Sequence, residues 1–86
     1  MASSPDQPIT LQPETVQDLA QKLANLRHNI NNHLSLVIAS IELIKRKPEA
    51  AARMIDTIAE QPGKITEEVG RFSDGLEAVL GIIRKE

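Results

Sequence analysis

The chain has 86 residues and a formal net charge of −2, with one phenylalanine and no cysteine, tryptophan or tyrosine. This length permits one small domain, and a hydrophobic content made of Leu, Ile, Val and Ala favours close-packed helices over a β-sandwich. Acidic and basic residues are interspersed without a basic face or an aromatic stacking platform, which argues against a nucleic-acid partner. The lack of cysteine excludes disulfide bridges and thiol chemistry.

The sequence shows no sign of membrane insertion or secretion. No apolar run approaches the length of a membrane span, and the N-terminus lacks the basic-then-apolar order of a secretory signal. Together with the absence of cysteine, these features predict a cytoplasmic chain with no membrane span.

The N-terminal part of the chain predicts a tail followed by a long helix. Residues 1–12 carry serine, proline and few apolar groups, so we expect a flexible tail. Pro13 suits the first position of a helix because its missing N–H would be unpaired there in any case. The helix should run from about 13 to 46, because Pro48 disfavours the α conformation in the residue before it. The basic run 45–47 fits a helix C-terminus better than a phosphate site.

The first helix carries an apolar stripe with the three-four spacing of a packed seam. Its members are Val16, Leu19, Leu23, Leu26, Ile30, Val37 and Ile44. If Val16, Leu23 and Ile30 take the first heptad position, His28 falls on the sixth. His28 is therefore expected to face solvent, opposite the seam.

The second helix is expected to run from about 48 to 84. Its apolar stripe consists of Ala51, Ile55, Ile58, Pro62, Ile65, Val69, Phe72, Leu76, Val79 and Ile83. The phase is kept through Pro62, which favours one helix kinked near 62 over two separate helices, although the proline costs about 3 kcal/mol. The very short connection between the two helices predicts an antiparallel hairpin.

The apolar surface of each helix is wider than one seam. Further apolar residues flank the two stripes: Leu34, Ile38, Ile41, Leu80 and Ile82. A lone hairpin would leave this surface exposed, so the fold class we predict is all-α, an antiparallel helical hairpin that homodimerises into a four-helix bundle. A charge in the seam, as in Ile30→Asp or Phe72→Asp, should unfold the chain or make it monomeric.

A polar stretch, Arg27-His28-Asn29-Ile30-Asn31-Asn32-His33, interrupts the apolar pattern of the first helix. The run 26–34 resembles the phosphoacceptor box of sensor histidine kinases, in which His is followed by an acid, two variable residues, then Asn or Thr and often Pro and Leu. The likeness covers roughly 14–82 and indicates a dimerisation and histidine-phosphotransfer (DHp, HisKA-like) domain. It is also similar to the hairpin of sporulation phosphotransferases, where an Arg-His pair opens the box. The domain would occupy 13–86.

The resemblance implies a role for each position of the box. His28 would be the phosphoacceptor, and Asn32 would position water or the phosphoryl group. Asn29 replaces the family acid, and an amide is not a general base, which favours phosphotransfer or a phosphatase bias over autokinase chemistry. His33 stands where the family often has proline; we expect it to line the bundle rather than accept phosphate. Its five-residue spacing from His28 does not suit a shared metal, so no metal site is expected.

The resemblance also implies the partners. Arg27, Asn31, Ser35, Ala39 and Glu42 would form the surface that docks a response-regulator receiver domain, and Arg27 would help neutralise the phosphoryl charge. Mg²⁺ and ATP would belong to the receiver and to a separate ATP-binding kinase domain, so this chain should bind no cofactor and have no autonomous kinase activity.

Two alternatives stay open at this stage. The chain is either a piece of a larger sensor or a free-standing phosphotransfer protein. On a different interpretation, the hairpin is a helical dimerisation or scaffold module without phosphate chemistry, and His28 with its asparagines is a solvated helix surface.

Overall fold

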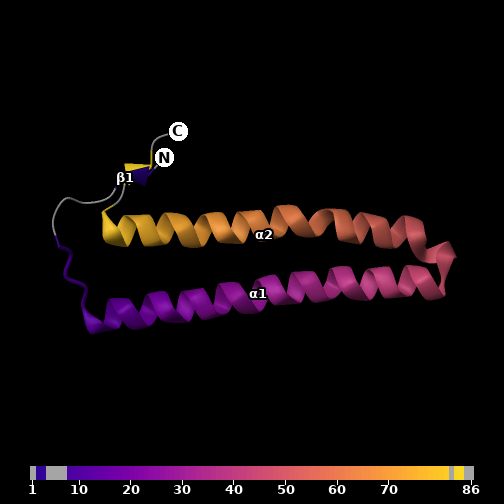
Figure 1. Ribbon diagram of the computed structural model, residues 1–86, viewed down its shortest axis with the longest axis horizontal. Helices are drawn as coiled ribbons and strands as arrows, with labels where there is room; N and C mark the ends of the chain where they lie inside the picture. Colours follow the sequence, from indigo (N-terminus) through magenta and orange to yellow (C-terminus); the bar gives the residue numbers. More distant parts are fainter. Residues whose placement is uncertain (1, 4–7, 82, 85–86) are drawn as a thin grey trace.

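The computed structural model describes residues 2–3, 8–81 and 83–84. Its elements are β1 (Ala2–Ser3), α1 (Pro13–Arg46), the 3₁₀ turn η1 (Pro48–Ala50), α2 (Ala51–Leu80) and β2 (Ile83–Arg84). The two helices run antiparallel and are joined by η1 at one end (Figure 1). With extents of 58 × 30 × 12 Å, the chain is one helix thick in its thinnest direction. The predicted all-α antiparallel hairpin is confirmed.

The bounds of α1 follow from the prolines at its two ends. Gln12 is extended and makes no side-chain cap, and Pro13 opens the helix. Lys47 leaves the α region at φ −134° and ψ 82°, and its N–H still donates to the carbonyl of Leu43 over 2.7 Å. Pro48 accounts for this exit because it disfavours the α conformation in the preceding residue.

The second helix is shorter than its stripe predicts. Pro48 opens the single 3₁₀ turn before α2 begins, and Gly81 adopts a left-handed conformation with φ 69° and ψ 27° that ends the helix. Extension of the helix to residue 84 was therefore wrong, because glycine at this C-terminal position stops the helix at little steric cost. The helix α2 continues through Pro62, although proline has no N–H to donate to the preceding turn. This agrees with the apolar stripe, whose spacing is unchanged on the two sides of Pro62.

The two chain ends pair with each other near the open end of the hairpin, beside the C-terminal part of α2 (Figure 1). Ala2 pairs with Arg84 and Ser3 with Ile83 in a two-stranded antiparallel ladder, which the sequence did not predict. Of the expected tail, residues 8–12 are non-helical. The structure does not describe residues 1 and 4–7 of that tail. It also does not describe Ile82, one of the apolar residues expected to flank the stripe of the second helix.

Only part of the predicted seam lies between the helices. The half-buried apolar side chains that line the contact include Leu19, Leu26, Ile30, Val37 and Ile44 from α1 and Ile58, Ile65, Phe72 and Leu76 from α2. Val16 and Leu23, placed at the first heptad position of the seam, are 50% and 47% exposed. Ile30, the third residue assigned to that position, is half-buried. A single hairpin therefore covers the assigned seam only in part, because one facing helix covers a narrower arc than the apolar stripe occupies.

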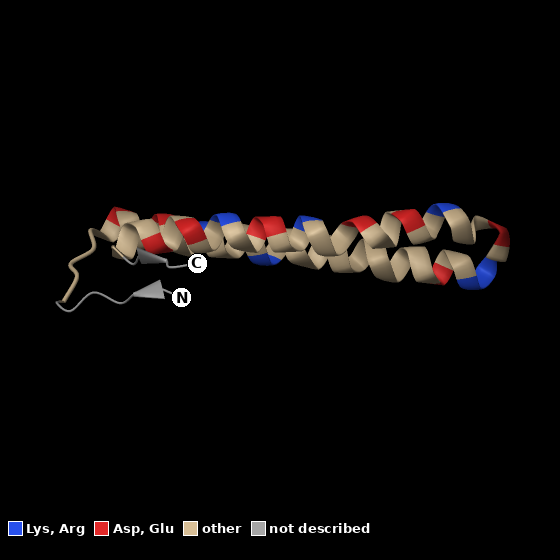
Figure 2. Cartoon of the chain, turned by 90° about the horizontal axis from the view of Figure 1, so that it is seen from above, with Lys and Arg blue, Asp and Glu red and all other residues tan. Residues whose placement is uncertain are grey.

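Most of the uncovered apolar residues gather on one side of the hairpin. On each helix, the direction of a side chain can be compared with that of the half-buried residues facing the other helix, at about 100° per residue. The uncovered apolar residues are turned from that direction to the same side on both helices. Because the helices are antiparallel, this is one face, which we call the apolar face; its residues are Val16, Leu23, Leu34, Ile38 and Ile41 from α1 and Ile55 and Val69 from α2, all exposed. Residues 28–41 contain no Lys, Arg, Asp or Glu, so this part of α1 is drawn in tan without a break in Figure 2.

Candidate functional site

His28 lies on the outward side of α1 and is exposed. At about 100° per residue it points away from Leu26 and Ile30, the nearest side chains that turn towards α2. Asn32 lies one helical turn further on, on nearly the same side. The two side chains are therefore open to a partner that approaches the back of α1.

The amide of Asn32 contacts the imidazole of His28, with 3.3 Å between Asn32 Nδ2 and His28 Nε2. An amide nitrogen can only donate, so Nε2 accepts and the ring proton of a neutral His28 sits on Nδ1. In this tautomer the nitrogen at the tip of the ring carries the lone pair. An unprotonated imidazole nitrogen with a lone pair is a nucleophile, and an adjacent amide N–H can stabilise negative charge placed there.

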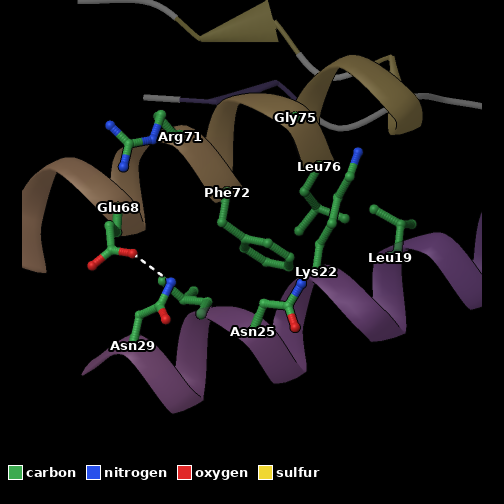
Figure 3. Close-up of a pocket in the computed structure, with 10 residues that line it drawn as sticks. Leu19, Lys22, Asn25, Asn29, Glu68, Arg71, Phe72, Gly75 and Leu76 are labelled. Carbon is green, nitrogen blue, oxygen red and sulfur yellow. Dashed lines mark hydrogen bonds between the residues drawn. The ribbon is translucent and has the colours of Figure 1, made fainter. Parts of the chain in front are cut away.

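Asn29 turns away from the outward side and makes its contact across the hairpin. Its Nδ2 donates to Oε1 of Glu68 over 2.8 Å (Figure 3). The residue that follows the candidate phosphoacceptor is therefore tied to α2.

Glu68 continues this contact into a cluster between the helices. Its Oε2 lies 2.7 Å from Nε2 of His33, and Nδ1 of the same ring lies 2.8 Å from Oε1 of Gln61. Gln61 is only 2% exposed, and its Nε2 donates to the carbonyl of Thr57 over 2.8 Å. We call Asn29, His33, Gln61 and Glu68 the interhelical polar cluster. His33 thus lines the hairpin, as the sequence predicted.

The hydrogen bonds from His33 and Asn29 hold the pKa of Glu68 below its ordinary value, because both donors favour the charged carboxylate. Sequence reasoning missed Gln61 and Glu68. The available signal was their seven-residue spacing, which places both on the inner side of the second helix. Polar side chains at such shielded positions require hydrogen-bond partners, and the facing helix is where those partners would lie.

A groove of about 370 Å³ opens between the two helices (Figure 3). At about 100° per residue, its polar lining residues lie on the side of the hairpin opposite the apolar face. Apolar side chains of Leu19, Leu26, Phe72 and Leu76 line it together with Lys22, Asn25, Asn29, Glu68, Arg71 and Gly75. The two cations on its rim are paired with carboxylates, Lys22 with Asp18 at 2.9 Å and Arg71 with Glu67 at 2.7 Å. The hairpin thus has one apolar face and one polar, grooved face.

The residues predicted to dock a partner are all exposed on α1: Arg27, Asn31, Ser35, Ala39 and Glu42. At about 100° per residue, the last four share the outward side of α1 with His28, whereas Arg27 is turned towards the apolar face. Glu42 also lies 3.6 Å from Lys45 in an exposed pair on the same helix.

Two general features of the described residues bear on the class of site. Among residues 8–81, no three His, Cys, Asp or Glu side chains are grouped so that they could hold a metal ion. Within the same part of the chain, no helix combines the length and apolar character needed to cross a bilayer. The candidate site is the exposed pair of His28 and Asn32 on α1. Comparison with protein-family models, curated proteins and solved structures finds no match to this chain.

Proposed function

We propose that this chain is a histidine phosphotransfer and dimerisation module of two-component signal transduction. In this function His28 accepts a phosphoryl group from the aspartate of a response-regulator receiver domain, or returns one to it. The observation that carries the proposal is the contact between the Asn32 amide and Nε2 of His28 on the exposed side of α1, within a run that resembles a phosphoacceptor box.

The proposed step uses the tautomer that Asn32 favours. The lone pair of His28 Nε2 attacks the phosphorus of the receiver aspartyl phosphate, a nitrogen–phosphorus bond forms, and the aspartate oxygen leaves as a carboxylate. Nδ1 keeps its proton throughout. The Asn32 amide donates to a phosphoryl oxygen in this transfer. In the phosphatase form of the proposal it instead orients a water that attacks the phosphorus of the receiver aspartyl phosphate, which releases inorganic phosphate and the aspartate carboxylate. The receiver supplies Mg²⁺, so the step requires no cofactor bound by this chain.

The environment of Asn29 favours phosphotransfer or phosphatase activity over attack of His28 on ATP. An amide cannot accept the histidine proton as the family acid does, and this amide is already engaged with Glu68. ATP would belong to a separate kinase domain. The same observation favours the second candidate function, a helical scaffold module in which the box has lost its chemistry.

A homodimer is the second part of the proposal. The apolar face leaves large side chains of both helices exposed, including Ile38 at 62% and Ile55 at 56%. An uncovered apolar surface of this extent on a thin hairpin is stabilised by a second hairpin, which closes the core as a four-helix bundle. His28 and the outward residues of α1 lie away from the apolar face, so dimerisation there leaves the docking surface accessible.

Phosphotransfer from a labelled receiver tests the proposal. The chain is incubated with aspartyl-phosphorylated receiver domains beside His28→Ala, Asn32→Ala and the control Asn25→Ala. Asn25 is an exposed asparagine of α1 that bonds Gln21 over 3.0 Å, away from His28. We expect acid-labile label on the wild type, none on His28→Ala, a loss of about tenfold in transfer rate for Asn32→Ala, and no change for the control.

The remaining outcomes separate the candidate functions. Faster dephosphorylation of the receiver, without stable label and dependent on Asn32, assigns the phosphatase form of the proposal. Equal labelling of wild type and His28→Ala contradicts it. Absence of label, dephosphorylation and receiver binding supports the scaffold function instead.

A further inference from the structure

The interhelical polar cluster joins α1 and α2 through one continuous chain of hydrogen bonds. Asn29 and His33 come from α1, and Gln61 and Glu68 from α2. The three cross-helix contacts measure 2.7 to 2.8 Å between heavy atoms. The side chains of His33 and Glu68 are 22% and 17% exposed. In the other ion pairs described in this hairpin, every side chain is at least 55% exposed.

The directions of these hydrogen bonds determine where the protons are. Gln61 Nε2 is spent on the Thr57 carbonyl, so its Oε1 faces the ring and His33 Nδ1 must donate. At the other nitrogen, Nε2 faces a carboxylate oxygen of Glu68. A carboxylate only accepts, so Nε2 must also donate. Both contacts of the ring are therefore satisfied only when both of its nitrogens carry a hydrogen, whereas a neutral ring can satisfy one of them.

The surrounding cations are paired with other carboxylates, and the attraction of Arg71 is the smallest of the causes that lower the pKa of Glu68. The hollow beside His33 is lined on α2 by Lys64, Glu67 and Arg71, and Lys22 of α1 lines the neighbouring groove. Each of these cations has its own carboxylate partner on the same helix. The donors that reach Glu68 across its two oxygens are His33 and Asn29.

We propose that the proton on His33 is a clamp between α1 and α2, which closes the hairpin beside Asn29 and loosens it when His33 becomes neutral. Loss of the proton leaves one ring nitrogen without a hydrogen to offer, either towards Glu68 or towards Gln61, and a shielded acceptor is then unpaired. The clamp is independent of phosphate chemistry at His28, so the proposal stands whether or not that residue is phosphorylated.

The pH dependence has a defined sign. Because the proposed clamp needs a hydrogen on both ring nitrogens, it weakens when His33 loses a proton, so its stabilisation falls as the pH rises. Stabilisation from Glu68, whose pKa is lowered, is present above the ordinary carboxyl value of 4.5 and is lost as the pH falls below it.

The test compares the free energy of unfolding in denaturant across about pH 5 to about pH 8, at one protein concentration. The variants are His33→Gln and Glu68→Gln. Two controls match them: His28→Gln removes the other histidine, and Glu67→Gln removes the neighbouring carboxylate from an exposed ion pair. We expect the folding equilibrium constant of the wild type and both controls to fall about two- to fivefold as pH rises, and the slope to vanish in the two cluster variants.

A slope that survives Glu68→Gln, or that disappears equally in Glu67→Gln, overturns the clamp. A second measurement needs no variant, so it holds even if a cluster variant fails to fold. Nitrogen-15 spectra of the wild-type histidine rings at about pH 6 should show His33 protonated on both Nδ1 and Nε2. An unprotonated Nε2 in the folded protein at that pH contradicts the proposal.

Discussion

Replacing Ile38 with aspartate is expected to convert the proposed dimer into a monomer while the helical hairpin remains folded. Ile38 is 62% exposed in the single chain and lies on the apolar face, so a carboxylate there remains hydrated in the hairpin. In a dimer closed over this face, the same carboxylate loses its water without a partner. The dissociation constant of the dimer should rise about a hundredfold or more. Light scattering measures the mass, and circular dichroism measures the helix content.

The matched control is Ala39→Asp, which introduces the same charge one residue later on the outward side of α1. This variant should remain dimeric. By contrast, Ile30→Asp or Phe72→Asp should lower helix content as well, since both residues are half-buried between the two helices. If Ile38→Asp stays a dimer while Ala39→Asp becomes monomeric, the contact lies on the outward side of α1 and the docking assignment there is wrong as well.

The difference between these variants shows how far the sequence pattern determines the packing. The three-four spacing of α1 identifies one broad apolar stripe, but it does not divide the stripe between two neighbours. Val16 and Val37 both belong to that stripe, yet Val16 is exposed on the apolar face and Val37 is half-buried against α2. The division follows only from the rotation of each helix about its own axis, which long-range packing sets.

Local signals were sufficient for both ends of α1. Pro13 and Pro48 bracket α1 because each acts on the backbone of its own immediate neighbourhood. Gly81 offered an equally local signal for the end of α2, but the apolar stripe that continues to Ile83 outweighed it in the prediction. The pairing of Ala2–Ser3 with Ile83–Arg84 has no local signal, since it joins the two ends of the chain.

The contacts of the candidate site also include one that the sequence predicts locally and one that it does not. The contact between His28 and Asn32 follows from their four-residue spacing on one helix and was predictable. The contact between Asn29 and Glu68 spans 39 residues and depends on the register of α1 against α2. The short connection fixes the antiparallel direction, but the register also depends on how the side chains at the seam interdigitate.

Asn29→Asp, which restores the acid of the resembling family, is expected to destabilise the hairpin at neutral pH. The substitution exchanges the Nδ2 donor, 2.8 Å from Oε1 of Glu68, for a second carboxylate oxygen. Two carboxylates at this separation repel each other, and Glu68 loses one of its two donors. The folding equilibrium constant should fall about tenfold at neutral pH, measured by denaturant unfolding. Because the repulsion raises the pKa of one carboxyl, stability should recover as the pH falls and that group binds a proton.

A second substitution and a matched control test the cause. In Asn29→Asp/Glu68→Gln, the new amide can donate to the introduced carboxylate, so stability at neutral pH should return towards that of Glu68→Gln alone. The control is Asn25→Asp, one helical turn earlier. Asn25 Oδ1 accepts from Gln21 Nε2 over 3.0 Å, and a carboxylate keeps that acceptor, so little change is expected. Two outcomes contradict this explanation: equal destabilisation by Asn25→Asp and Asn29→Asp, or no rescue in the double variant. Either one would show that the contact with Glu68 is not the reason why α1 carries asparagine after His28.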